Sequence, residues 1–206
     1  MTEVAVVNTG VANFGSIESA FSRVGGTTRI AICSQDIERA SHIVLPGVGS
    51  FDVALQNIDQ QGLRDVIRRR VDEDNIPLLG ICLGMQLLGF TSEEGDKTGL
   101  GFLDGRTTRL VRDVLKVPHI GWNSVTWDGQ FRLMDGITSG ERFYFVHSYH
   151  YVATSEDDVV GRSQYGGDVT AIVQRGNVVG TQFHPEKSRA GGLLLLRNFL
   201  RMTPND

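Results

Sequence analysis

The chain has few of the residues that cross-link, break or anchor a protein. It contains 2 cysteines and 5 prolines among 206 residues, and no apolar run approaches the roughly 20 residues that span a bilayer. Two cysteines are too few for a disulfide framework, and the first residues lack the basic stretch of a secretory signal. We therefore expect a cytoplasmic protein in a reducing compartment.

Neither sign of charge dominates. Lysine and arginine total 20 against 24 acidic residues, which gives a net charge of -4. The concentrated basic tract Arg68-Arg69-Arg70 lies in a polar, helix-like stretch, so it indicates a solvated helix face rather than a nucleic-acid patch. With 40% apolar residues, the chain can bury a core, and its length predicts a single domain over residues 1–206.

The first half of the chain alternates between short apolar runs and helical periodicity. We expect strands and helices in turn over residues 4–7, 16–24, 28–33, 36–40, 43–45, 51–58, 63–72 and 77–81. This alternation predicts an α/β fold with a mostly parallel central sheet flanked by helices.

The second half is richer in β-branched and aromatic residues. Residues 107–127 and 142–151 read as strands, and residues 169–173 and 178–183 flank a hairpin turn. We expect these antiparallel strands to extend the sheet. A helix over residues 191–202 closes the chain.

The segment Gly80-Ile81-Cys82-Leu83-Gly84 has the pattern of a nucleophile elbow. A short apolar run precedes the cysteine and a helix-like segment follows it, so Cys82 would sit on a sharp strand-to-helix turn with its side chain exposed. The two glycines let the backbone crowd together there. The backbone N–H of Leu83 would then point at a developing oxyanion. The alternative is a buried cysteine at a tight turn, because short motifs also occur by chance.

Two further segments add to this pattern. His184 and Glu186 stand two residues apart around Pro185, where an extended backbone projects both side chains to one side, as a base and its orienting acid require. The loop Pro46-Gly47-Val48-Gly49 follows an apolar strand and could supply a second oxyanion N–H. Alone, each reads equally as a strand cap or an ordinary turn.

Together these segments resemble the class I, or triad, glutamine amidotransferases. Within that family the chain is similar to the glutaminase subunits of imidazole glycerol phosphate synthases. The resemblance covers essentially the whole chain, and its further matches are Thr9-Gly10-Val11-Ala12-Asn13, Pro118-His119-Ile120-Gly121-Trp122-Asn123 and Tyr144-Phe145-Val146-His147-Ser148-Tyr149.

The resemblance implies a flavodoxin-like fold and a role for each matching residue. The catalytic residues would be Cys82, His184 and Glu186. The oxyanion hole would use the N–H groups of Leu83 and of Val48 or Gly49. Glutamine would be bound by Gly47, Gln86, His147, Ser148 and Tyr149, and a partner would contact Asn13, Trp122, Asn123 and Lys187. Neither a cofactor nor a metal is implied.

The resemblance also implies a partner. Ammonia released from glutamine would pass to a (β/α)₈-barrel cyclase subunit (HisF) in a heterodimer, which converts the ribotide PRFAR to imidazole glycerol phosphate and AICAR in histidine biosynthesis. Two alternatives stay open. One is a paralogous subunit that supplies ammonia to a sugar-amidating synthase, and the other is a non-catalytic partner or thiol-sensor module.

The remaining candidates are weaker. His147 and His150 are three residues apart, so on one strand they would point to opposite faces and could not chelate one ion together. Cys33 ends an apolar run and reads as a core thiol. Asn8 departs from the family pattern, because many members carry an acid there, and the change leaves the triad intact.

Overall fold

The computed structural model describes residues 2–10, 12–111 and 116–204. Its first half builds strands and helices in alternation: β1 (Thr2–Val7), α1 (Phe14–Arg23), β2 (Gly26–Ala31), α2 (Ser34–Glu38), β3 (His42–Leu45), α3 (Phe51–Gln60), α4 (Leu63–Asp72), β4 (Leu78–Ile81) and α5 (Leu83–Leu87). Each predicted strand and helix of this half is present.

The second half is mainly β. Its strands are β5 (Thr91–Ser92), β6 (Gly105–Arg109), β7 (His119–Ser124), β8 (Arg142–His147), β9 (Tyr149–Ala153), β10 (Val159–Gln164), β11 (Asp168–Arg175) and β12 (Val178–Thr181). Short 3-10 turns occur at Arg132–Met134, Glu156–Asp158 and Pro185–Lys187, and helix α6 (Arg189–Phe199) comes last.

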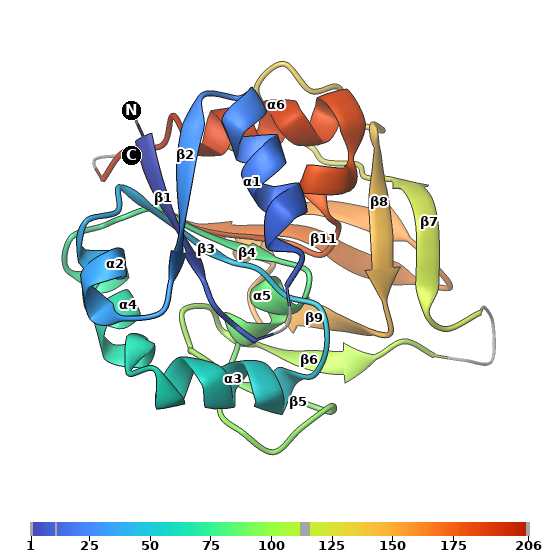
Figure 1. Cartoon of the computed structure of the whole chain (residues 1–206). Coiled ribbons are helices and arrows are strands. Elements are labelled where there is room, and N and C mark those ends of the chain that lie inside the picture. The colour runs from blue at the N-terminus through green and yellow to red at the C-terminus, as the bar shows by residue number, and fades with distance from the viewer. Residues whose placement is uncertain (1, 11, 112–115, 205–206) are drawn as a thin grey trace.

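A seven-stranded sheet forms the centre of the molecule (Figure 1), with the order β10-β11-β12-β4-β3-β1-β2. The five strands from β12 to β2 run parallel, while β11 pairs antiparallel with both β10 and β12. This confirms the predicted α/β fold with a mostly parallel sheet.

One part of the prediction was wrong. Strands β10 and β11 extend the central sheet antiparallel, as predicted, but the described residues of 107–127 and 142–151 form strands of two small sheets beside it, β5-β6-β9 and β7-β8. Thr126 makes an isolated bridge to Arg162 of β10, and residues 112–115 lie outside the described part of the chain. The segment 142–151 is also two strands, broken at Ser148, with β8 in one small sheet and β9 in the other.

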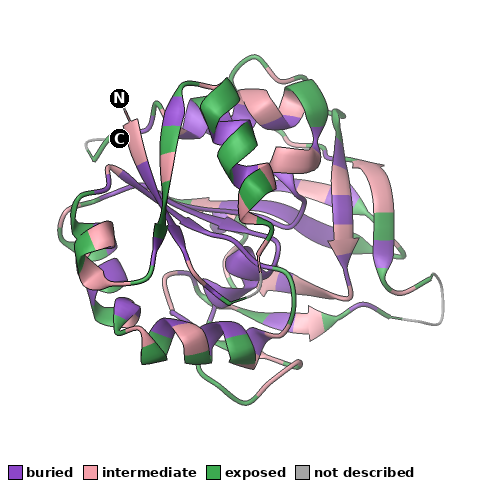
Figure 2. Ribbon diagram, in the orientation of Figure 1, coloured by how far each residue is buried: buried purple, intermediate pink, exposed green. Residues whose placement is uncertain are grey.

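The sheet is covered on both faces. Alternate residues along β1 show this, since Ala5 and Val7 pack into one apolar cluster while Val4 and Val6 pack into the other. Helices α2, α3, α4 and α5 supply the first cluster, and α1 and α6 supply the second (Figure 1). The central strands are buried along their length (Figure 2).

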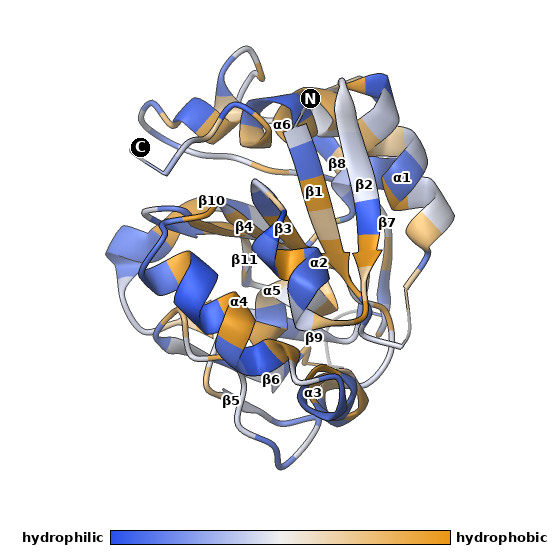
Figure 3. Cartoon of the chain, turned by 60° about the vertical axis from the view of Figure 1, so that its left-hand side comes forward, coloured by the Kyte–Doolittle hydropathy of each residue, from blue (hydrophilic) through white to orange (hydrophobic). Residues whose placement is uncertain are grey.

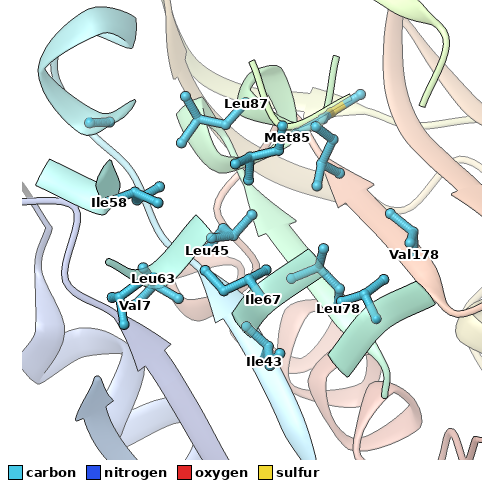
Figure 4. Packing of buried hydrophobic residues seen from close by; sticks show 14 of the residues in the cluster. Val7, Ile43, Leu45, Ile58, Leu63, Ile67, Leu78, Met85, Leu87 and Val178 are labelled. Carbon is cyan, nitrogen blue, oxygen red and sulfur yellow. The ribbon is translucent and has the colours of Figure 1, made fainter. Parts of the chain in front are cut away.

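Helix α4 shows how sequence periodicity selects the buried face. Its Leu63 and Ile67, four residues apart, lie in the same apolar cluster as Leu45 and Leu78 of the sheet (Figure 4). The opposite face is hydrophilic (Figure 3) and carries the basic tract, whose arginines pair with carboxylates of Asp72, Asp74 and Glu38. The tract is therefore a paired, solvated helix face, as predicted. No helix in these described residues is long and apolar enough to cross a membrane.

Candidate active site

The carboxyl ends of three adjacent parallel strands meet at one edge of the sheet. Cys82 follows the middle strand, β4. The Pro46–Gly49 loop follows β3 on one side of it, and the segment from Gln182 to Glu186 follows β12 on the other. Ligands of open α/β sheets bind at this edge. Strand order therefore brings together three segments that lie far apart in the sequence.

Cys82 sits on a strained turn. Its backbone has φ 53° and ψ -105°, a conformation that costs a residue with a Cβ about 1–3 kcal/mol. The turn is held in place because the Cys82 N–H donates to Thr181 O at 2.7 Å and its carbonyl accepts from Gln86 N at 3.3 Å. The predicted strand-to-helix turn is present, but its side chain is not exposed as expected, because Cys82 is 5% exposed and reaches solvent only where it lines a cavity.

Glycines allow the elbow to pack this closely. A Cβ on Gly84 would lie 1.8 Å from the carbonyl oxygen of Leu45, and one on Gly80 would lie 2.6 Å from the carbonyl oxygen of Gly84. Both obstacles are backbone atoms, so no side-chain rotation could relieve the clash. The two motif glycines are therefore required by the close approach of β3, β4 and α5.

His184 and Glu186 form a buried pair behind the cysteine. The His184 Nδ1 to Glu186 Oε1 distance is 2.8 Å, and each side chain is 3% exposed. The backbone of His184 is anchored twice, since its N–H donates to Tyr144 O and its carbonyl accepts from the Ser188 hydroxyl. Its Nε2 is buried and makes no hydrogen bond in the described structure.

Electrostatics favour the charged imidazole. Burial alone would lower the pKa of His184, but the Cys82 sulfur and the Glu186 carboxylate outweigh it and raise that pKa to about 10. Below that pH the imidazole holds a proton beside the cysteine sulfur. This is the arrangement that activates a thiol as a nucleophile.

A cavity of about 290 Å³ opens onto Cys82. The residues that line it are Val48, Gly49, Cys82, Leu83, Gln86, Glu94, Pro118, Val146, His147, Ser148 and Tyr149. It therefore brings together both candidate oxyanion segments and four of the five residues expected to bind glutamine. Gly47 lies outside the lining, where a Cβ would meet the Leu83 side chain at 2.6 Å.

The backbone N–H groups suit an oxyanion. Leu83 is the first residue of α5, so its N–H has no intrahelical acceptor, and the helix dipole favours negative charge at that end. Val48 and Gly49 approach the same cavity from the β3 loop. Both segments that could supply an N–H therefore line the cavity together with Cys82.

His147 pairs with His119 rather than with His150. The His119 Nδ1 to His147 Nε2 distance is 3.0 Å, and His147 Nδ1 lies 2.9 Å from the carbonyl oxygen of Tyr149. Burial lowers the pKa of His147 to about 3 and that of His119 to about 4, so both are neutral. The bond to Tyr149 places the proton of His147 on Nδ1.

Sequence reasoning missed two residues at this site. Glu94 places a carboxylate in the cavity wall, where it accepts from Phe51 N at 3.0 Å and burial raises its pKa. Gln182 is fully buried, and its Nε2 lies 3.7 Å from Cys82 Sγ. Its position two residues before His184, inside an apolar run, was the available signal.

The residues expected at a partner interface lie in two groups. Asn13 caps α1 by accepting from Ser16 N, and it shares a cavity with Glu186. Lys187 follows in the same 3-10 turn as Glu186. Trp122 lies on β7 with the Arg189 guanidinium 4.7 Å from its ring centroid, and Asn123 donates to Gln164 O.

Two other sequence candidates differ from expectation or lie away from the site. Cys33 is not a core thiol, because β2 ends at Ala31 and Cys33 lies half-buried at the start of α2 with its Sγ 3.2 Å from Asp36 Oδ2. Asn8 accepts from Gly10 N through its side chain and stabilises the local turn.

Comparison with known proteins matches the chain to the family model "Glutamine amidotransferase class-I" over residues 6–202. Similar curated proteins carry the name imidazole glycerol phosphate synthase subunit HisH. That of Moorella thermoacetica is 44% identical over 97% of this chain and 94% of its own length, and "HisH 2" of Pseudomonas aeruginosa is 42% identical over 97% and 99%.

Solved structures agree on the fold. "Structure of PurLQS from Thermotoga maritima" aligns with a TM-score of 0.77 at 20% identity, covering 97% of each chain. "Crystal structure of glutamine amidotransferase" gives 0.75 at 20%, covering 94% of this chain and 98% of its own.

Proposed function

The chain belongs to the class I glutamine amidotransferase family, and on that premise we propose that it is the glutaminase subunit of an imidazole glycerol phosphate synthase. One observation carries the proposal. A strained elbow cysteine lies between a buried imidazole–carboxylate pair and a cavity of suitable size for an amino acid.

We assign the chemistry as follows. The Cys82 sulfur attacks the side-chain carbonyl of glutamine, and His184 delivers a proton to the leaving amine, which departs as ammonia. Glu186 holds the imidazole through the 2.8 Å contact and balances its charge. Water then hydrolyses the γ-glutamyl thioester with His184 as base, so that glutamine and water give glutamate and ammonia.

The oxyanion of each tetrahedral intermediate is stabilised by Leu83 N–H and by an N–H of Val48 or Gly49. Losing one such donor typically costs ~100–1000-fold in rate. Both segments line the cavity beside the sulfur, which supports this role.

The far wall of the cavity suits the amino-acid end of the substrate. Glu94 offers a carboxylate for the α-ammonium group. The Gln86 amide nitrogen already donates to Tyr149 O at 2.9 Å and to Gln182 Oε1 at 3.3 Å. Its own carbonyl oxygen is therefore the atom that would accept from the ammonium. Ser148 and Tyr149 complete this wall.

The ammonia needs an acceptor enzyme. The curated relatives are named as subunits of a synthase, so we propose a (β/α)₈-barrel cyclase as partner, with contacts at Asn13, Trp122, Asn123 and Lys187. The cyclase would use the ammonia to convert PRFAR to imidazole glycerol phosphate and AICAR.

The test is glutamate release from glutamine, with and without the cyclase of the same organism and PRFAR. We expect a large ligand-dependent rise that Cys82→Ser abolishes. Hydrolysis only with a different, sugar-amidating synthase would replace the proposed partner, and no hydrolysis under any pairing would refute the catalytic role.

A further inference from the structure

We propose that Gln182 is a positioning residue for the cysteine, which fixes the Cys82 sulfur for attack and ties it through Gln86 to the wall of the glutamine pocket. This inference rests on the proposed glutaminase function. It concerns a buried residue that touches the nucleophile and does not line the cavity.

The location of Gln182 follows from its strand. It comes directly after β12, whose partner in the sheet is β4, the strand that ends at Cys82. Its backbone N–H donates to Ala171 O at 2.9 Å, which holds it in line with β11. The amide is therefore delivered to the sulfur by two neighbouring strands rather than by a mobile loop.

A fully buried carboxamide requires partners for both of its ends. Gln182 is 0% exposed. Its Nε2 donates to Cys82 Sγ at 3.7 Å, a normal distance for a sulfur acceptor, and its Oε1 accepts from Gln86 Nε2 at 3.3 Å. Leaving either end of the carboxamide unpaired inside the protein would cost free energy. Both hydrogen bonds are therefore needed, and together they fix the orientation of the Gln182 side chain.

The carbonyl of Tyr149 fixes the direction in which this chain of hydrogen bonds donates. The carbonyl of Tyr149 can only accept, so Gln86 must turn its NH₂ group toward it, at 2.9 Å. The same NH₂ group faces Gln182, which must therefore present its oxygen. The NH₂ group of Gln182 is then left to face the sulfur.

The sulfur has a second neighbour of opposite character. In the thiol form Cys82 Sγ donates to Val146 O at 3.7 Å. A thiolate cannot donate and would be repelled by that carbonyl, whereas the Gln182 N–H attracts it. Loss of the proton to His184 thus moves the stabilising contact from Val146 to Gln182.

Two variants distinguish the hydrogen bond from Gln182 to the sulfur from the one that it accepts from Gln86. Gln182→Met keeps the volume and removes both hydrogen bonds. Gln182→Glu keeps an acceptor toward Gln86 but places a second acceptor, without an N–H, against the sulfur. If the inference holds, the methionine variant weakens both sulfur reactivity and glutamine binding, and the glutamate variant weakens chiefly the first.

The experiment measures alkylation of Cys82 by iodoacetamide in the complex with the cyclase, by mass spectrometry of this chain, in a Cys33→Ser background so that Cys82 is its one thiol. At neutral pH we expect Gln182→Met to lower the alkylation rate about tenfold, since hydrogen bonds to charged groups are the stronger ones. kcat for glutamine should fall by a similar factor and KM should rise. Gln182→Glu should lower alkylation and kcat with a smaller change in KM.

The matched control is Gln174→Met, a half-buried glutamine on β11 whose amide donates to Gly176 O away from the site. It should leave alkylation, kcat and KM unchanged. Because alkylation needs no glutamine, a reactive Cys82 without glutaminase activity would refute the proposed function alone. Unchanged alkylation and kcat in a folded Gln182→Met variant would overturn the role of Gln182.

Discussion

The strain at the elbow makes an unusual prediction: at the position of the nucleophile, glycine should give a more stable protein than alanine. At φ 53° and ψ -105° a residue with a Cβ pays about 1–3 kcal/mol, and glycine does not. Glycine loses about 0.5–1 kcal/mol through the greater entropy of the unfolded chain. We therefore expect Cys82→Gly to be more stable than Cys82→Ala by about 1 kcal/mol.

The comparison with alanine is essential, because both variants lose the sulfur and its packing, and only one keeps the strained Cβ. For a chain of this size, 1 kcal/mol shifts Tm by roughly 2–4 °C, so the glycine variant should melt about 2–4 °C above the alanine variant. Thermal unfolding followed by circular dichroism measures this. Both variants should have no glutaminase activity.

A control in the same sheet should show the opposite effect of glycine on Tm. Ala5 is fully buried in β1 and has an ordinary backbone conformation, so Ala5→Gly should lower Tm. If Cys82→Gly melted at or below Cys82→Ala, the elbow would store no strain, and the argument from its backbone geometry would be refuted.

Three further predictions concern packing and protonation. Gly84→Ala should lower kcat at least 100-fold, because its new Cβ would lie 1.8 Å from Leu45 O and the elbow must shift to relieve the clash. Gly15→Ala, whose Cβ would meet only ordinary contacts, should leave kcat unchanged. Steady-state glutamine hydrolysis measures both. The pKa of His184 is raised from 6.5 to about 10, so between these values the folded chain keeps a proton that the unfolded chain releases. The free energy of unfolding should therefore fall as pH rises through that range. Urea unfolding measures it, and the His184→Asn variant should lack this slope. The pKa of His119 is lowered by burial to about 4, so below pH 6.5 the unfolded chain binds more protons than the folded chain. The free energy of unfolding should therefore fall as the pH is lowered toward 4. The same urea titration of His119→Asn should show a shallower fall, and a fall as steep as that of the natural chain would contradict the assignment.

Much of the fold followed from local pattern. Helix α4 begins and ends where its apolar periodicity predicted, at Leu63 and Asp72, because one apolar stripe faces the sheet along its whole length. The elbow was also predicted, since a cysteine between two glycines after an apolar strand is typical of a nucleophile elbow, although the motif alone did not exclude a buried cysteine at a tight turn.

The sequence did not predict which sheet each strand of the second half would join. The segment 142–151 has one continuous β-forming character, yet it divides at Ser148 between two sheets. The choice depends on partners distant in sequence, His119 to Ser124 for β8 and Gly105 to Arg109 for β9, and nothing local specifies them.

The missed site residues share a physical reason. Gln182 and Glu94 are single polar residues without a motif, and their roles come from a sulfur atom 3.7 Å away and from a cavity wall. Only the three-dimensional arrangement distinguishes them from the other polar residues of the chain. Cys33 was misplaced because the apolar run of the sequence continues two residues past Ala31, where strand β2 ends.

The central claim is that Cys82 carries the acyl group of glutamine. The most direct measurement is mass spectrometry of the complex quenched in acid during turnover of glutamine, followed by peptide mapping. We predict a mass increase of one γ-glutamyl group on the peptide that contains Cys82, absent from the Cys33 peptide and from Cys82→Ser. Glutamate release that persists in Cys82→Ser would contradict the account.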